Sequence, residues 1–118
     1  MQNRNILCVD DELNILLGFK RHLRKEFDLT LAVGAERAME ALNSGVKFAV
    51  IISDMQMPGM NGIQLLNKAQ ELAPNSVRMM LTGMADQKTA IAAVNEGNIF
   101  RFLNKPCSPD KLADALNA

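Results

Sequence analysis

The 118-residue chain carries 13 Lys and Arg against 13 Asp and Glu, so its formal net charge at pH 7 is zero. This balance argues against nucleic-acid binding through phosphate neutralisation, and a chain without Trp or Tyr has few side chains for base stacking. We expect one globular domain over residues 1–118, because single domains commonly run to about 100–150 residues.

Cysteine usage and apolar segments indicate the compartment. Cys8 and Cys107 stand far apart, with neither a CxxC pair nor a histidine cluster that would predict zinc. The sequence shows no signal peptide, and no apolar run approaches the roughly 20 residues that span a bilayer. We therefore expect a cytoplasmic domain that makes no membrane contact.

Short apolar runs alternate with segments of helical period along the chain. Largely apolar runs of four or five residues predict strands buried on both faces at 6–9, 29–33, 49–52, 77–81 and 99–103. Strict alternation of strand and helix predicts an α/β fold with a parallel sheet and helices on both faces.

Five helices are expected between and after these runs. Apolar residues three or four positions apart form two clear stripes, namely Leu16, Phe19, Leu23 and Phe27, then Ile63, Leu66, Ala69 and Leu72. Shorter patterns predict a helix after Gly34, another around 90–94 that ends at Gly97, and a last one that Ser108 caps, with Pro109 in its first position.

Reactive side chains follow four of the five predicted strands. Asp10 and Asp11 come after the first, Asp54 after the third, Thr82 after the fourth and Lys105 after the fifth. Because ligands of such sheets bind at the carboxyl ends of the strands, we expect these groups to meet at one edge.

Each of these residues has a structural explanation when it is taken alone. Asp10 or Asp11 suits a helix N-cap, and an isolated Lys105 is most often a solvated charge. Together, however, carboxylates about 4 Å apart repel by roughly 4 kcal/mol at an effective dielectric constant near 20, so the cluster needs a cation. Oxygen ligands favour Mg²⁺ with a phosphoryl group, and the central Asp54 is the natural nucleophile for an acyl phosphate.

Four motifs resemble the receiver domain of bacterial two-component response regulators. They are "ILCVDDE", "VIISDMQMPGMNG", "MMLTG" and "FRFLNKP", and together the resemblance covers essentially the whole chain. It implies a flavodoxin-like, doubly wound sheet of five parallel strands in the order 2-1-3-4-5, flanked by five helices.

The resemblance also implies roles for the residues at the sheet edge. Asp54 would accept a phosphoryl group from a sensor histidine kinase or a histidine phosphotransfer protein. Asp11, Asp54 and the backbone carbonyl of Gln56 would ligate Mg²⁺, and Asp10 would act largely through a bound water. Thr82 and Lys105 would neutralise the oxygens of the phosphoryl group.

Further roles concern switching and phosphate lifetime. Thr82 and Phe102 would change conformation on phosphorylation, although a purely structural core role for Phe102 is equally favoured. Gln56 and Met84 flank the route of the hydrolytic water in the family, so they would tune phosphate lifetime. Leu13 and Leu17 lie outside the first helical stripe and form either a kinase-docking patch or, as slightly favoured, a wide core face.

Two other functions are weighed against the receiver switch. An aspartate-nucleophile phosphatase needs a second carboxyl two residues after the nucleophile, where this chain has Gln56, so we expect no enzyme beyond self-phosphorylation and self-dephosphorylation. A degenerate, phosphate-independent interaction module is disfavoured because every site position is present.

A last helix about one turn short for the family suggests a chain cut from a longer regulator. Its partners would include an output domain, for which an HD-type phosphodiesterase is a weak analogy, and a phosphorylation-linked homodimer through the fourth and fifth helices.

Overall fold

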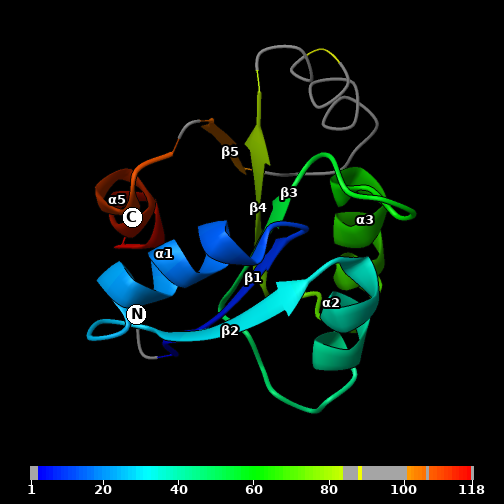
Figure 1. Cartoon of the computed structure of the whole chain (residues 1–118). Helices are drawn as coiled ribbons and strands as arrows, with labels where there is room; N and C mark the ends of the chain where they lie inside the picture. Colours follow the sequence, from blue (N-terminus) through cyan, green and yellow to red (C-terminus); the bar gives the residue numbers. More distant parts are fainter. Residues whose placement is uncertain (1–2, 84–87, 89–100, 106, 118) are drawn as a thin grey trace.

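A single parallel sheet forms the centre of the computed structural model, which describes residues 3–83, 88, 101–105 and 107–117 (Figure 1). Its strand order is β2-β1-β3-β4-β5, which confirms the expected doubly wound sheet. The strands are β1 (Asn5–Asp10), β2 (Asp28–Val33), β3 (Val50–Asp54), β4 (Val77–Thr82) and β5 (Arg101–Asn104). All four pairs of neighbouring strands are parallel.

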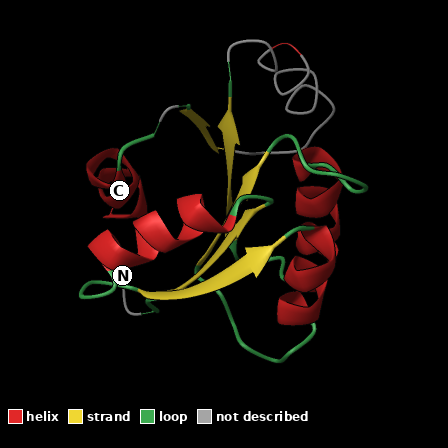
Figure 2. Ribbon diagram, in the orientation of Figure 1, coloured by secondary structure: helices red, strands yellow, loops and turns green. Residues whose placement is uncertain are grey.

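Helices cover both faces of the sheet (Figure 2). The described residues include α1 (Leu13–Leu23), α2 (Ala35–Leu42), α3 (Gly62–Leu72) and α5 (Pro109–Asn117). Helices α1 and α5 lie on one face, and α2 and α3 lie on the other (Figure 1). The helix expected around 90–94 falls outside the described residues, so four of the five expected helices are confirmed.

Each sheet face carries its own hydrophobic cluster. Leu7, Ile51 and Met80 pack with α2 and α3 on one side. Ile6 and Ile52 pack with α1 and α5 on the other. Residues adjacent in β1 and in β3 therefore serve opposite clusters, as expected for strands buried on both faces.

The thiol of Cys8 belongs to this core. Cys8 is only 1% exposed, and burial raises its pKa to about 12. A thiol held in this protonated form is a small packing group rather than a nucleophile. Both cysteines are free.

Local signals at the helix ends agree with the structure. Gly34 has a φ of +86° where β2 turns into α2, a conformation that side chains with a Cβ rarely adopt. The Ser108 hydroxyl accepts a hydrogen bond from the Lys111 amide at 3.2 Å, which confirms the predicted cap of α5.

Several predictions of helix length and of burial were wrong. Helix α1 ends at Leu23, so Phe27 is buried from the following loop rather than from the helix. Leu72 is 44% exposed, because Leu65, Leu66 and Ala69 form the buried face of α3 instead. Strand β2 lies at the sheet edge, where Val33 is 42% exposed, so this run is not buried on both faces.

The favoured core interpretation of Leu13 and Leu17 was also wrong. These side chains are 49% and 42% exposed on α1, whose buried residues are Leu16, Phe19 and Leu23. The alternative, a docking patch, stays a prediction. No helix among the described residues is long and apolar enough to cross a membrane.

Leu112 anchors α5 against the α1 side of the sheet and is fully buried. We predict that Leu112→Ala lowers the free energy of unfolding by about 2–4 kcal/mol, since it removes buried methyl groups and leaves a cavity. Urea unfolding followed by far-ultraviolet circular dichroism measures this change. Leu72→Ala, at an exposed helical leucine, is the matched control and should change stability by no more than about 0.5 kcal/mol. Equal effects of the two substitutions would contradict the packing described for α5.

Candidate functional site

Four strand ends place the sequence-predicted groups at one edge of the sheet. Asp10, Asp54 and Thr82 are the last residues of β1, β3 and β4, and Lys105 follows directly after β5. Strands β1 and β3 are neighbours, and β4 and β5 continue the sheet from β3. The parallel register therefore brings residues 95 positions apart in the sequence into one site.

Three carboxylates form a tight acidic cluster. One oxygen each from Asp10, Asp11 and Asp54 lies within 4.8 Å of the others. Asp10 and Asp54 are 1% and 3% exposed, whereas Asp11 is exposed to solvent. At an effective dielectric constant near 20, each such pair repels by about 3 kcal/mol, so the cluster favours a bound cation.

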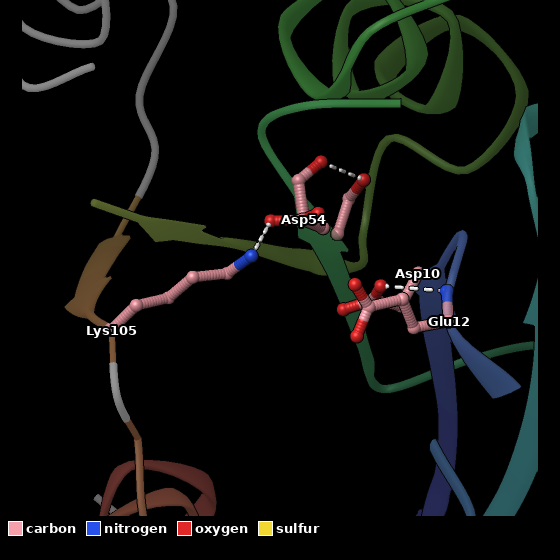
Figure 3. A network of polar contacts seen from close by, with 5 residues as sticks. Asp10, Glu12, Asp54 and Lys105 are labelled. Atoms are coloured by element: carbon pink, nitrogen blue, oxygen red, sulfur yellow. Dashed lines mark hydrogen bonds and ion pairs between the residues drawn. The ribbon is translucent and has the colours of Figure 1, made fainter. Parts of the chain in front are cut away.

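The surroundings of the Asp10 carboxyl raise its pKa. Burial raises the pKa of Asp10 to about 6, and the neighbouring Asp54 charge acts in the same direction. A hydrogen bond of 3.0 Å from the Glu12 amide to Asp10 Oδ1 opposes the increase (Figure 3). In the absence of a cation, Asp10 thus holds a proton more readily than an ordinary aspartate.

Lys105 supplies the positive charge on the other side of Asp54. Its ammonium forms an ion pair with Asp54 Oδ1, reaching across from the end of β5 (Figure 3). Burial alone would lower the pKa of Lys105, but the hydrogen bond and charge of Asp54 outweigh it, and the pKa is raised. Lys105 therefore remains a cation at neutral pH and neutralises the central carboxylate.

Two buried oxygens at this edge have no hydrogen-bond partner among the described residues. They are Asp10 Oδ2 and Thr82 Oγ1. Buried polar atoms are normally satisfied, so each oxygen is available to a partner outside the described residues. An all-oxygen donor set with a buried unpaired carboxylate oxygen fits a hard divalent cation such as Mg²⁺. The Thr82 hydroxyl, unpartnered among these residues, fits an anion bound at this edge of the sheet.

The main chain of Asp54 is fixed by contacts that the sequence did not reveal. The Met55 amide donates to Leu81 in β4 at 3.1 Å, and the Gly62 amide donates to the Met55 carbonyl at 2.9 Å. A Cβ on Gly62 would come within 3.0 Å of the Met55 Cα and even closer to the Asp54 carbonyl oxygen. Gly62 thus lets the start of α3 press against the Asp54 backbone, and the Asn61–Gln64 capping box fixes that helix end. The glycine stood in a quoted motif, but only the packing reveals its role.

Comparison with known proteins identifies the family. The response regulator receiver domain model matches residues 6–117. The chain belongs to this receiver family.

Relatives of the receiver include transcriptional and enzymatic regulators. Hydrogenase transcriptional regulatory protein HoxA of Bradyrhizobium diazoefficiens is 35% identical over 94% of this chain and 23% of its own length. A solved structure described as adenylate cyclase from Rhodopirellula baltica is 44% identical, with a TM-score of 0.92, over 98% of this chain and 85% of that one. The signal receiver domain of an HD domain-containing protein from Pseudomonas fluorescens is 33% identical, with a TM-score of 0.87, over 98% and 93% of the two chains.

The curated relatives are longer proteins. This chain spans about a quarter of the length of the first regulators that it matches. The family assignment therefore concerns the receiver, and the comparison confirms a signalling switch of two-component systems rather than a particular output.

Of the remaining sequence-predicted residues of the receiver, Gln56 and Phe102 belong to the described part of the chain and Met84 does not. Gln56 is exposed on the loop two residues after Asp54. Phe102 lies in β5 opposite Met80 of β4, is half-buried, and packs against the cluster under α2 and α3. Met84 lies outside the described residues, so its predicted influence on phosphate lifetime stays a prediction.

The raised pKa of Asp10 predicts a pH-dependent effect of removing its charge. The pKa of this carboxyl rises from 3.8 to about 6 on folding, so its protonation stabilises the folded state fully below pH 3.8. This contribution to the free energy of unfolding is lost as the pH rises through about 6. At pH 7.5, without a divalent cation, the ionised Asp10 therefore opposes folding. We predict that Asp10→Asn, which keeps an acceptor for the Glu12 amide, raises the free energy of unfolding by about 1–3 kcal/mol.

Urea unfolding in EDTA at pH 7.5 and at pH 4 measures this effect. The gain should shrink at pH 4, where Asp10 is already protonated in the folded chain. Asp114→Asn removes an exposed carboxylate from α5 and is the matched control with little expected change. An unchanged or lower stability of Asp10→Asn at pH 7.5 would contradict the burial and repulsion described for this carboxyl.

Proposed function

We propose that Asp54 is the phosphoacceptor of this receiver and that Mg²⁺, Lys105 and Thr82 assist the transfer. The observation that carries the proposal is a nearly buried carboxylate at the end of β3, with two carboxylates on one side and an ammonium on the other. The phosphodonor would be a phosphohistidine of a sensor kinase or of a histidine phosphotransfer protein.

In the transfer, one Asp54 carboxylate oxygen attacks the phosphorus atom. The phosphorus–nitrogen bond to the donor imidazole breaks, and its electron pair leaves with the imidazole nitrogen. Asp54 becomes an acyl phosphate, so the charge at the end of β3 grows more negative. Since Lys105 pairs with Oδ1, it can orient the carboxylate and offset this charge without being displaced from the site.

Mg²⁺ would be held by Asp10, Asp11, Asp54 and the backbone carbonyl of Gln56, with Asp10 acting largely through water. The bound cation would neutralise negative charge on the phosphoryl oxygens. Support comes from the close carboxylate oxygens, the unpaired Asp10 Oδ2 and the cost of leaving these charges uncompensated.

Thr82 and Phe102 would carry the signal away from Asp54. The buried Thr82 hydroxyl has no hydrogen-bond partner among the described residues, so a phosphoryl oxygen would give it one. The Thr82 carbonyl accepts a hydrogen bond of 2.9 Å from the Lys105 amide, and Phe102 lies in the adjacent strand. A local shift at Thr82 would thus reach β5 directly, changing the environment of Phe102.

The residues and partners around this centre complete the proposal. Gln56 and Met84 would tune the lifetime of the acyl phosphate. We infer that the chain is one domain, residues 1–118, of a longer cytoplasmic regulator, and that its output is a partner or a linked domain. An HD-type output is supported by the solved neighbour from Pseudomonas fluorescens, whereas a transcriptional output is supported by the HoxA relatives.

Incubation with acetyl phosphate followed by intact mass spectrometry tests the phosphoacceptor. We predict one added phosphoryl group on the wild-type chain in the presence of Mg²⁺ and its loss in EDTA. Asp54→Asn should abolish the adduct because an amide does not form the acyl phosphate. Asp28→Asn, at an exposed carboxylate on the edge strand β2, is the matched control and should be phosphorylated normally.

An adduct that survives in Asp54→Asn would overturn the assignment of Asp54. An adduct that forms equally in EDTA would overturn the role of Mg²⁺. No adduct on the wild type, either with acetyl phosphate or with phosphorylated kinases, would instead favour a phosphate-independent interaction module.

A further inference from the structure

Strand β2 forms one edge of the sheet. The strand order places it at the end of the sheet opposite β5, with β1 as its neighbour (Figure 1). An edge strand carries a row of backbone N–H and C=O groups on the side that faces away from the sheet. The outer side of β2 can therefore pair with a further strand.

Two hydrogen bonds at the ends of β2 fix which of its backbone groups point outward. The Asp28 amide donates to the Arg4 carbonyl at 2.9 Å, and the Gly34 amide donates to the Asp10 carbonyl at 3.0 Å. Because backbone groups alternate in direction along a strand, the even-numbered residues between these ends also face β1. The residues whose amides and carbonyls point away from the sheet are Leu29, Leu31 and Val33.

This edge lacks the usual protection against pairing. Edge strands are commonly shielded by lysine, proline or a bulge. The sequence of β2, DLTLAV, contains neither lysine nor proline, and its register with β1 runs without interruption. Its outward backbone groups take part in no turn or loop hydrogen bond among the described residues. Val33 is 42% exposed and Leu31 is half-buried, so apolar side chains accompany the open backbone groups.

We propose that β2 pairs antiparallel with β2 of a second copy of this chain, which joins the two sheets into one. Directly opposed residues of an antiparallel pair exchange both hydrogen bonds when the backbone groups of both face the partner. A two-fold axis at Leu31 meets this condition, because it places Leu31 opposite Leu31 and Leu29 opposite Val33. In this register every outward amide and carbonyl of both strands is paired.

The side chains match in the same register. Leu29 packs in the hydrophobic cluster beneath α1 and α5, and alternate residues of a strand share a face, so Leu31 and Val33 lie on that side too. All opposed pairs on this side are therefore apolar, and pairing covers the exposed part of Val33. On the other face, Thr30 lies opposite Ala32. The strand thus complements itself on both faces of the sheet.

The charges of this region favour a second copy as the partner. Asp28, the one charged residue of β2, lies opposite Gly34 of the other copy in this register. Gly34 is the N-cap of α2, and no side chain caps that helix. Asp28 shares the α2 side of the sheet with Ala32, so its carboxylate comes near the positive end of the other copy's α2. Glu36 and Arg37 in the first turn of α2 add no net charge there.

This interface is separate from the surfaces considered above. It lies beyond β1, at the end of the sheet opposite β5, and differs from the homodimer expected through the fourth and fifth helices. The proposal concerns the unphosphorylated chain and does not depend on the role proposed for Asp54.

Sedimentation velocity of the unphosphorylated chain tests the dimer. Over about 5 to 500 µM, a range suited to a small interface, the weight-average mass should rise from 13.0 kDa towards twice that value. Val33→Lys should weaken the association at least about tenfold, because it places a charge among the apolar pairs of the edge. Val46→Lys, at a similarly exposed valine of the loop between α2 and β3, makes the same charge change away from β2 and should leave the association unchanged.

Amide hydrogen exchange followed by nuclear magnetic resonance locates the contact. The amides of Leu29, Leu31 and Val33 should exchange about threefold more slowly, or slower still, at 500 µM than at about 20 µM, because they gain hydrogen-bond partners in the dimer. The amides of Thr30 and Ala32 face β1 and serve as internal controls, whose exchange should change much less with concentration.

A cysteine at the two-fold axis tests the register in a chain that carries Cys107→Ser. Opposed residues of a hydrogen-bonded antiparallel pair have Cα atoms about 5.5 Å apart, which suits a disulfide. Oxidation by a glutathione redox buffer should therefore cross-link Leu31→Cys into a dimer. Thr30→Cys is more exposed but lies off the axis, so it should cross-link much less. Cys8 is buried and does not compete.

Circular dichroism establishes that each variant is folded before these comparisons. A chain that remains monomeric at 500 µM overturns the proposal, as roughly millimolar affinity would be too weak for the contact described. A dimer that tolerates Val33→Lys, or that leaves the outward amides of β2 unprotected, also overturns it, because that dimer would use another surface. Equal cross-linking of Thr30→Cys and Leu31→Cys would contradict a two-fold axis at Leu31.

Discussion

The repulsion among three carboxylates at the end of the sheet is the constraint on which the remaining structure depends. Asp10, Asp11 and Asp54 bring oxygens within 4.8 Å of one another, and two of these side chains are almost completely buried. Only one ammonium, that of Lys105, pairs with the cluster among the described residues. Burial and the charge of Asp54 consequently raise the pKa of Asp10 to about 6. Without a metal ion, the electrostatic free energy of the site is unfavourable, and binding of a divalent cation or a phosphoryl group would change it.

A parallel sheet is well suited to hold this arrangement. Asp10, Asp54 and Thr82 each stand at the end of a strand whose interior is buried, so these groups are held close together despite the repulsion between the carboxylates. Asp54 is fixed further by the Met55 amide, which bonds to β4, and by Gly62, whose missing Cβ lets α3 close against it. The core thus provides the stability that offsets an electrostatically unfavourable site, a common relation between a scaffold and its functional centre.

The sequence was informative where the structure is governed by chain-local patterns. Apolar runs located the five strands to within two residues, and the residues after them revealed Asp10, Asp54, Thr82 and Lys105, because strand ends in a parallel sheet share one edge. Burial on the surface of helices was less predictable, as Leu17 and Leu72 show, because periodicity does not specify how far a core face extends around a helix. The close approach of Gly62 to Asp54 was inaccessible for a related reason, since it depends on tertiary packing.

The most direct test of the account is the effect of Mg²⁺ on thermal unfolding at pH 7.5, followed by circular dichroism in the wild type and in Asp11→Asn. Asp11 is exposed, so its substitution changes the charge of the cluster with little effect on packing. We predict that about 10 mM Mg²⁺ raises the melting temperature of the wild type through preferential binding to the folded chain, and raises that of Asp11→Asn much less. Equal melting temperatures of the wild type with and without Mg²⁺ would contradict the claim that the crowded carboxylates form a cation site.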